Sequence, residues 1–391
     1  MIKKQSCTAV SIRVLASALC MVAGLAWPTA AIETPAKSAV VIEVATGKVL
    51  LDKNADVPMA PASMSKLMTL YLLFERLKDG SLSLDDTFRI SENAWRKGGI
   101  KSGSSTMFLP PRKRVKIEDL IRGIIVQSGN DACIVVAEGL SGSEEAFAAE
   151  MTERGREIGL QNSTFRNSTG WPHPEHRMTP RDLATLSAAL IKRFPEFYHY
   201  FKEAEFTYGG IRQVNRNPLL YKEIGVDGLK TGYTRESGYG LAASALRGER
   251  RIILVVNGLK SKKARSREPE RLMEWAFREF NNYALFKAGE QLDEAHVWLG
   301  TSGRVPLIIK EDVTLTFPRK HRRKMKVKLI YDGPIPAPIK RGTEVGEVVV
   351  SLPGQADLSV PVLAGADVEQ LGLFGRLWSA VSTILLGEAG S

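Results

Sequence analysis

Apolar residues recur at helical spacing in three stretches of the first half of the chain. Residues 67–74, 117–126 and 132–140 each place apolar side chains three or four positions apart, which is the pattern of a helix with a buried face. A fourth helix is expected after Thr179, because a threonine cap, a proline at the first position and an acid in the first turn favour a helix start.

Strand-like segments bounded by turn residues predict a sheet. Residues 38–53 indicate two strands joined at a glycine turn, and residues 240–246 and 252–256 form a second pair around Arg247-Gly248-Glu249. Short connections of this kind favour antiparallel pairing. With a further strand through Lys230, they predict an α+β fold in which an antiparallel sheet is flanked by helices.

The pattern changes beyond Leu285. Short β-rich runs separated by proline and glycine follow at residues 305–309, 313–317, 327–331 and 345–352. This spacing is typical of a small all-β domain. The basic run at residues 319–324 lies between two of these strands, so we interpret it as a solvated face or as a contact with anionic lipid or wall polymer, and not as a nucleic-acid module.

The N-terminus has the pattern of an export signal. Lys3 and Lys4 precede a mostly apolar stretch at residues 14–26, and small residues suitable for cleavage follow at 29–31. The alternative, a membrane-spanning anchor, is disfavoured because Arg13 shortens the apolar run below a full span.

The C-terminal segment predicts an amphipathic helix. Its apolar side chains recur at helical spacing, with Arg376 among the polar residues opposite them. These apolar residues are Leu371, Phe374, Leu377, Trp378, Val381, Ile384 and Leu385. We expect this helix to lie in the membrane interface, with packing against a domain as the alternative.

Four parts are therefore expected along the chain: a signal peptide at 1–31, an α+β domain at 32–285, a small all-β domain at 286–364 and the amphipathic helix at 365–391. A length of 391 residues allows two domains with appendages. Hydrophobic residues make up 44% and charged residues 25%, which is ordinary for a globular protein with a sizeable core.

The first candidate for chemistry is the pair Ser63 and Lys66. Residues three apart share a face of a helix, so the lysine could take the proton of the serine hydroxyl if burial or a nearby cation keeps its amine neutral. A serine cap followed by a solvated lysine would give the same spacing. The residues 91–105, rich in glycine, serine and lysine, are expected to form a loop that borders this site.

Two further tripeptides follow in order. Ser128-Gly129-Asn130 lies between two helical patterns and is expected to form a tight turn that faces a cleft, and Lys230-Thr231-Gly232 follows a short strand. Each could be an ordinary turn by itself. Together with Ser63-x-x-Lys66, they complete a three-part signature of serine acyl transferases.

With these motifs the sequence resembles the serine penicillin-binding proteins and β-lactamases, and among them the low-molecular-mass D-alanyl-D-alanine carboxypeptidases. The resemblance extends from about Ser38 to Tyr283, with weaker similarity beyond, and implies the β-lactamase/transpeptidase-like fold. Two departures are Ser65, where the family usually has threonine, and Ser237, where alanine is common. Neither removes a group with an assigned chemical role.

The resemblance implies the catalytic roles. Ser63 would be the nucleophile that attacks the penultimate carbonyl of a D-alanyl-D-alanine stem peptide, Lys66 the general base, and Ser128 the relay that passes a proton to the leaving amine. β-Lactams would act as covalent inhibitors. The enzyme would lie at the periplasmic face of the cytoplasmic membrane.

The resemblance also implies the substrate-binding residues. Asn130 would hold the peptide amide, Lys230 and Thr231 would bind the terminal carboxylate, and Lys230 would also keep Lys66 neutral. The backbone N–H groups of Ser63 and Tyr233 would form the oxyanion hole. Gly232 completes the motif, and Arg265 is expected just before a helix at residues 268–280, where it either helps to hold the carboxylate or is solvated.

Other chemistry is disfavoured by the residues present. Cys133, the one cysteine outside the signal, lies on an apolar helix and is expected to be a buried hydrophobe and not a nucleophile. His173 and His176 have no third ligand cluster, so no metal site is expected, and neither is an organic cofactor.

Two alternative functions remain open. A β-lactamase would need a deacylating glutamate, which residues 153–170 do not clearly supply. A catalytically idle wall-binding protein would use the basic surface but would not need the three intact motifs. Neither the diamino acid of the stem peptide nor cleavage of cross-linked dimers follows from the sequence.

Overall fold

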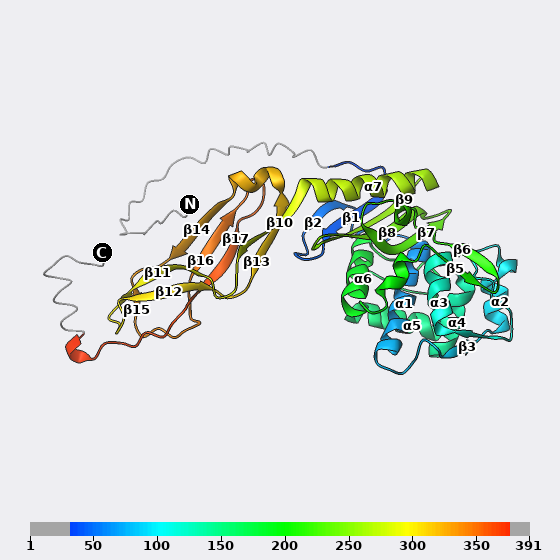
Figure 1. Ribbon diagram of the computed structural model, residues 1–391, viewed down its shortest axis with the longest axis horizontal. Helices are drawn as coiled ribbons and strands as arrows, with labels where there is room; N and C mark the ends of the chain where they lie inside the picture. Colours follow the sequence, from blue (N-terminus) through cyan, green and yellow to red (C-terminus); the bar gives the residue numbers. More distant parts are fainter. Residues whose placement is uncertain (1–31, 376–391) are drawn as a thin grey trace. The chain divides into compact units, whose positions relative to one another are not determined.

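The computed structural model describes residues 32–375, which form two compact units divided at residues 278 and 279. The expected signal peptide and most of the expected amphipathic helix, from residue 376 onward, lie outside the described residues. The α+β fold and the separate all-β part predicted from the sequence are both confirmed (Figure 1).

The first unit is built on a five-stranded sheet. Both predicted hairpins and the strand through Lys230 are present, and each strand pairs antiparallel with its neighbours. In spatial order the strands are β2 (Val49–Lys53), β1 (Ser38–Glu43), β9 (Arg250–Leu259), β8 (Gly238–Arg247) and β7 (Val226–Thr234). The strand β7 therefore lies at one edge of the sheet, where one side of its backbone is left without a neighbouring strand.

Alternation along the strands creates two cores, one on each face. Val40 and Val255 belong to the cluster that also contains helix α1, whereas Val41 and Leu254 belong to the cluster packed against helix α7. This is the period-two alternation that a sheet covered on both faces requires. Figure 1 shows the same arrangement, with α7 along one face and α1 and α6 on the other.

The five predicted helices are present, α2 and α5 were not predicted, and two expectations need correction. They are α1 (Lys66–Lys78), α2 (Glu92–Gly98), α3 (Ile117–Arg122), α4 (Asn130–Ser141), α5 (Glu144–Glu157), α6 (Pro180–Arg193) and α7 (Lys262–Glu279). Thr179 caps α6 as expected, because its side chain accepts a hydrogen bond from the Asp182 backbone. Two small antiparallel pairs complete the unit: β3 (Thr87–Arg89) with β4 (Arg114–Lys116), and β5 (Glu205–Tyr208) with β6 (Ile211–Val214).

The first correction concerns residues 91–105, which were expected to form a loop. Helix α2 occupies half of this stretch, and the Ser91 side chain caps it by accepting from the Ala94 backbone. The helix packs closely on α4, since a Cβ atom on Gly98 would lie 2.3 Å from the Asp131 backbone nitrogen. A capping serine and the close packing of a glycine therefore account for this helix, which has no long apolar stripe.

The second correction concerns Arg265, which was expected to precede a helix. Helix α7 begins six residues earlier than predicted, with Ser261 accepting from the Ala264 backbone, so Arg265 lies in its first turns. Residues 262–267 are mostly charged and show no helical spacing of apolar side chains. The apolar pattern therefore predicts only the later, buried part of the helix.

The second unit is all-β. A six-stranded sheet has the order β14 (Lys326–Tyr331), β16 (Glu344–Ser351), β17 (Leu358–Ala364), β12 (Arg304–Ile309), β11 (Gln291–Trp298) and β15 (Ile335–Pro336), and β10 (Phe280–Phe286) pairs with β13 (Val313–Pro318). Strands β12, β13, β14 and β16 confirm the four predicted runs, whereas the other four were not predicted. The basic run at Arg319–Lys324 forms a short 3-10 helix.

The all-β unit continues past residue 364. Val368 is buried and exchanges backbone hydrogen bonds with Ile339, and the Leu371 backbone N–H donates to the Leu299 carbonyl. Leu373 and Phe374, by contrast, are 73% and 90% exposed. Residues up to Leu371 thus belong to the β unit, and apolar side chains become exposed directly after it.

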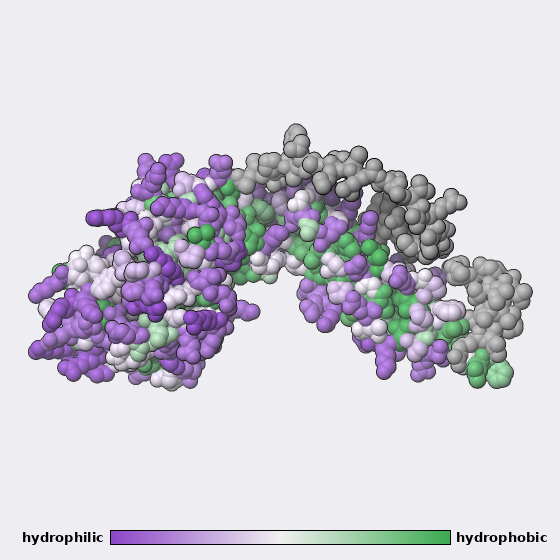
Figure 2. All heavy atoms as spheres, turned by 180° about the vertical axis from the view of Figure 1, so that it is seen from behind, coloured by the Kyte–Doolittle hydropathy of each residue, from purple (hydrophilic) through white to green (hydrophobic). Residues whose placement is uncertain are grey.

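The surface differs between the units in character. On the face that Figure 2 presents, residues over the first unit are mainly hydrophilic, whereas hydrophobic residues gather on the all-β unit. Among residues 32–375, no helix combines the length and apolar character that a membrane span requires.

Candidate active site

Ser63 lies in a 3-10 turn, Ala62–Ser65, that leads directly into α1. Ala62 has a left-handed φ of 49°, which is unusual for a residue with a side chain. The turn is enclosed on two sides: a Cβ atom on Gly232 of β7 would lie 2.8 Å from the Pro61 carbonyl oxygen, and one on Gly170 would lie 2.0 Å from the Ala62 carbonyl oxygen. Two glycines therefore permit the close packing that holds the serine in place.

Lys66 is the first residue of α1 and is fully buried. Its Nζ donates to Ser63 Oγ at 2.9 Å, to Asn130 Oδ1 at 2.7 Å and to the Thr169 carbonyl oxygen. The pKa of Lys66 is lowered to about 8. Burial is the largest cause and the charge of Arg216 adds to it, whereas Cys133, Asp131 and Glu144 act in the opposite direction. A substantial neutral fraction is therefore available near neutral pH, as a general base requires.

Ser128 and Asn130 come from the turn between α3 and α4, as predicted. Ser128 has a left-handed φ of 63°, and its Oγ is buried without a hydrogen-bond partner among the described residues. Asn130 begins α4 and uses both ends of its amide, since Oδ1 accepts from Lys66 and Nδ2 donates to Ser104 Oγ at 2.9 Å. The turn thus carries a buried hydroxyl without a partner and an amide that is bonded to Lys66.

Strand β7 supplies the third motif. Lys230 is buried, and its Nζ donates to the Thr231 carbonyl oxygen at 3.3 Å. Burial lowers the pKa of Lys230 well below its usual value, and the charge on Lys66 adds to this effect. Two buried amines that interact in this way disfavour simultaneous protonation. Tyr233 is exposed and stacks on Tyr239, with ring centroids 4.2 Å apart.

Two arginines add positive charge to the site. Arg265 of α7 donates to the Gly232 carbonyl oxygen at 3.5 Å and lies over the Tyr239 ring, while its Nε is buried without a partner among the described residues. Arg216, which sequence reasoning missed, bonds to Ser105 Oγ, and its charge lowers the pKa of both Lys66 and Lys230. It follows β6 in a segment with no motif, so no sequence signal marks it.

Among the described residues, Cys133 and the two histidines make no hydrogen bond to Ser63, Lys66 or Lys230. Cys133 is fully buried, which confirms the expectation, and burial raises the pKa of its thiol to about 12. His176 is buried, with Nδ1 accepting from the Arg166 backbone. Across residues 32–375, no group of three histidine, cysteine, aspartate or glutamate side chains is placed to hold a metal ion.

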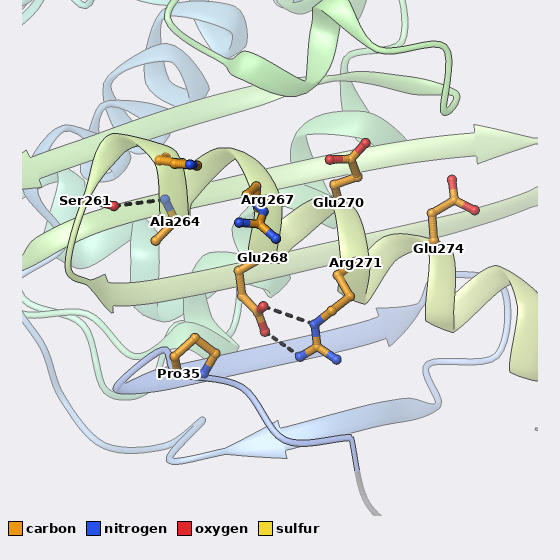
Figure 3. A pocket seen from close by; sticks show the side chains of 9 residues that line it. Pro35, Ser261, Ala264, Arg267, Glu268, Glu270, Arg271 and Glu274 are labelled. Atoms are coloured by element: carbon orange, nitrogen blue, oxygen red, sulfur yellow. Dashed lines mark hydrogen bonds and ion pairs between the residues drawn. The ribbon is translucent and has the colours of Figure 1, made fainter.

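A cavity of the first unit is lined by other residues than those of the site. It has a volume of about 650 Å³ and lies along α7, between Pro35 and residues such as Arg267 and Arg271 (Figure 3). Its acids are already paired: Glu268 with Arg271, Glu270 with Lys222, and Glu274 with Arg247. Ion pairs therefore bound this cavity, and none of the three motifs lines it.

Comparison with known proteins identifies the chain. The family described as D-alanyl-D-alanine carboxypeptidase matches residues 26–261, and the family described as the penicillin-binding protein 5 C-terminal domain matches residues 280–370. The chain belongs to the D-alanyl-D-alanine carboxypeptidase family. The D-alanyl-D-alanine carboxypeptidase DacC of Escherichia coli is 39% identical over 349 residues, which cover 88% of this chain and 87% of that protein.

Solved structures are similar over the same range. Penicillin-binding protein 5 from Haemophilus influenzae is 35% identical, covers 87% of this chain and 100% of that chain, and has a TM-score of 0.74. Penicillin-binding protein D2 from Listeria monocytogenes, in its ampicillin-bound form, is 30% identical with a TM-score of 0.55, and covers 63% of this chain and 98% of that chain.

The two departures from the D-alanyl-D-alanine carboxypeptidase motifs lie beside the site but turn away from the nucleophile. Ser65 Oγ is buried and donates to the Ala62 carbonyl oxygen at 3.1 Å. Ser237 Oγ accepts from the Thr234 backbone and donates to the Gly238 carbonyl oxygen. Both hydroxyls therefore stabilise turns, one before α1 and the other between β7 and β8.

Proposed function

We propose that this serine D-alanyl-D-alanine carboxypeptidase removes the terminal D-alanine from peptidoglycan stem pentapeptides, with Ser63 as the acylated residue. The observation that carries the assignment is the 2.9 Å hydrogen bond between Lys66 Nζ and Ser63 Oγ, together with the lowered pKa of Lys66. A buried amine at this distance can accept the hydroxyl proton as the oxygen attacks.

Acylation would proceed in two proton transfers. Neutral Lys66 takes the Ser63 proton while Oγ forms a bond to the penultimate carbonyl carbon. The tetrahedral intermediate then collapses, the bond to the leaving nitrogen breaks, and a proton passes through Ser128 to that nitrogen. The buried Ser128 hydroxyl, which has no partner among the described residues, is free to accept one proton and donate another. Water afterwards hydrolyses the acyl-enzyme.

The cations of the site would hold the terminal carboxylate. Lys230, Thr231 and Arg265 lie on or against β7, and an arriving anion favours the charged form of Lys230. Asn130 would orient the substrate amide through the side-chain nitrogen that now donates to Ser104. The Ser63 and Tyr233 backbone N–H groups would form the oxyanion hole, an effect of roughly 3 kcal/mol per donor.

We place the mature enzyme outside the cytoplasm, held at the periplasmic face of the membrane by its C-terminal helix. The signal-like N-terminus and the peptidoglycan substrate of the family support export. Exposed Leu373 and Phe374 at the start of the expected helix support the membrane contact.

Two measurements test the function. Fluorescent penicillin should label the mature protein covalently, and a defined pentapeptide should release free D-alanine. The control is Ser65→Ala, which changes a second serine of the same turn. This variant should retain both activities, because the Ser65 hydroxyl bonds only within that turn. Rapid loss of the label would favour a β-lactamase, and absence of labelling by a folded protein would favour an idle fold.

A further inference from the structure

The loop between α5 and α6 supplies one of the hydrogen-bond partners of Lys66. Two backbone hydrogen bonds between Thr164 and Arg177 join the ends of this loop, and Ser168 and Thr169 within it are buried. The Thr169 carbonyl oxygen accepts a hydrogen bond from Lys66 Nζ. None of the three motifs lies in this loop, yet it contacts the general base directly.

The partners of Lys66 Nζ differ in the hydrogen bonds that they can make. The Thr169 carbonyl oxygen and Asn130 Oδ1 can only accept, whereas the Ser63 hydroxyl can also donate. A charged amine donates to all of them, but a neutral amine has one N–H group fewer and a lone pair in its place. When its N–H groups bond to Thr169 and Asn130, the lone pair is left for Ser63, as a general base requires.

The side chain of Asn167 organises the turn that carries the Thr169 carbonyl. Its Oδ1 accepts from successive backbone N–H groups, those of Thr169 at 3.2 Å, Gly170 at 2.8 Å and Trp171 at 3.1 Å. The same oxygen accepts from Thr169 Oγ1 at 3.0 Å, and Nδ2 donates to the Trp171 carbonyl oxygen at 3.1 Å. One amide therefore holds the backbone of the whole turn.

The peptide unit between Thr169 and Gly170 links this amide to Lys66. It is not among the cis peptide bonds of the described residues, and a trans unit is planar with its C=O and N–H groups pointing in opposite directions. Because the N–H group points at Asn167 Oδ1, the C=O group points the other way, at Lys66 Nζ. The position of the amide thus sets the direction of the carbonyl.

Other contacts hold the turn but not the plane of this peptide unit. The Ser168 carbonyl oxygen accepts from Thr69 Oγ1 of α1 at 2.7 Å, and Ser168 Oγ donates to Glu144 Oε1 of α5 at 2.7 Å. Among residues 32–375, Asn167 Oδ1 is the one acceptor of the Gly170 N–H group. Without this acceptor the unit could turn its carbonyl away from the amine.

We propose that Asn167 is a positioning residue for the general base, and that it acts through the peptide unit after Thr169 to direct the lone pair of Lys66. Within the described part of the chain, Asn167 makes no hydrogen bond to Ser63 or Lys66 itself. A neutral amide suits this role, because it gathers N–H groups without adding a negative charge near the amine. The inference rests on the proposed function, which assigns the base to Lys66.

Titratable groups on several elements act electrostatically on Lys66. They are Cys133 and Asp131 of α4, Glu144 of α5, His176 of the same loop, Arg216 after β6 and Lys230 of β7. Replacing Asn167 by alanine changes none of these charges. A shift in the pH profile of that variant therefore reports on the hydrogen bonds of the amine.

The test measures the rate of covalent penicillin labelling of the mature protein as a function of pH. Asn167→Ala lets the peptide unit turn, so the amine can present an N–H group to Ser63 in place of its lone pair. The plateau rate at high pH should then fall at least about tenfold. The midpoint of the profile should move to lower pH, because the charged amine loses an acceptor.

Asn167→Asp should restore the plateau. Its carboxylate keeps an oxygen for the backbone N–H groups, so the plateau rate should stay within about threefold of that of the unaltered protein. The midpoint should move to higher pH, because the added negative charge favours the charged form of Lys66. Opposite shifts in the alanine and aspartate variants would distinguish the loss of an acceptor from the gain of a charge.

Ser168→Ala is the matched control. It removes a side-chain hydrogen bond to Glu144 from the neighbouring residue of the same turn and leaves the next peptide unit as it is. Its plateau and midpoint should equal those of the unaltered protein. Asn167→Leu fills the same space without an acceptor, should behave as the alanine variant does, and replaces it if that variant does not fold.

The shape of the profile separates positioning from loss of structure. A variant that only folds less well loses rate by the same factor at every pH, keeps its midpoint and binds less label at the end point. That result for Asn167→Ala, an unchanged plateau, or an aspartate variant that fails to restore the plateau would overturn the role of Asn167 and leave the carboxypeptidase activity intact. Absence of labelling of the unaltered, folded protein would overturn the proposed function as well.

Discussion

Lys66 and Asn130, 64 positions apart in the chain, are joined by a hydrogen bond of 2.7 Å from Nζ to Oδ1. The bond brings the first residue of α1 against the first residue of α4 and places a neutral amide beside a buried amine. A neutral acceptor at this position stabilises the lysine without adding the negative charge that would hold its proton.

Asn130→Asp should therefore shift the pH dependence of acylation upward. The new carboxylate favours the charged form of Lys66 and raises its pKa, so less neutral amine is present at neutral pH. The rate of penicillin labelling from pH 6 to 10 measures the shift. Asn130→Ala is the control, because it removes the amide without adding a charge, and an unchanged midpoint in the aspartate variant would contradict the role of Lys66.

Ser63→Ala should abolish covalent labelling and lower pentapeptide turnover by about a millionfold, as for other serine nucleophile deletions. Mass spectrometry of the labelled mature protein should find the adduct on Ser63. An adduct on Ser65 or Ser128 would show that another hydroxyl is the nucleophile.

The acylation rate of the unaltered protein should rise as the pH increases through about 8, the pKa to which burial lowers Lys66, and then level off. The rate rises because the deprotonated fraction of Lys66 grows with pH, and only the deprotonated amine can take the serine proton. Lys66→Arg should be inactive because arginine keeps its proton at these values. An active arginine variant would place the base elsewhere.

Ending the chain after Gly372 should release a soluble enzyme. Val368 and Leu371 remain bound to the β unit in this variant, whereas a cut at residue 365 would remove buried Val368. Each buried apolar side chain of the expected helix adds roughly 1.5–3 kcal/mol, so vesicle binding by the full mature chain should survive high salt. Co-sedimentation with vesicles measures both effects, and loss of penicillin labelling on truncation would assign the helix to the protein core.

The sequence predicted those elements whose signal is local. Thr179 and Pro180 mark a helix start through hydrogen bonding and a fixed φ angle, and the two hairpins are set by alternation and a glycine turn. The same holds for the order of the three motifs. No local signal predicts that the three motifs lie close together in space, because their proximity depends on how α1, α4 and β7 pack.

Other features were missed because their local signal is a single capping serine or because they depend on tertiary contacts. Helix α2 packs on α4 through Gly98, and in the first turns of α7, at residues 262–268, Ala264 is the one apolar residue. Arg216 acts at the site through its charge and follows no motif. The fixed geometry of the nucleophile turn depends on Gly170 and Gly232, which are far apart in the chain and come together only in the fold.

The separate cores of the two units bear on how the protein denatures. The clusters around the five-stranded sheet and the cluster of the all-β unit share no residue. Within residues 32–375, the chain passes from one unit to the other once, between Arg278 and Glu279. Each unit can therefore melt as its own cooperative block. A calorimetric scan should then contain two transitions, and penicillin binding should report on only one of them, so a single melting temperature does not describe this enzyme.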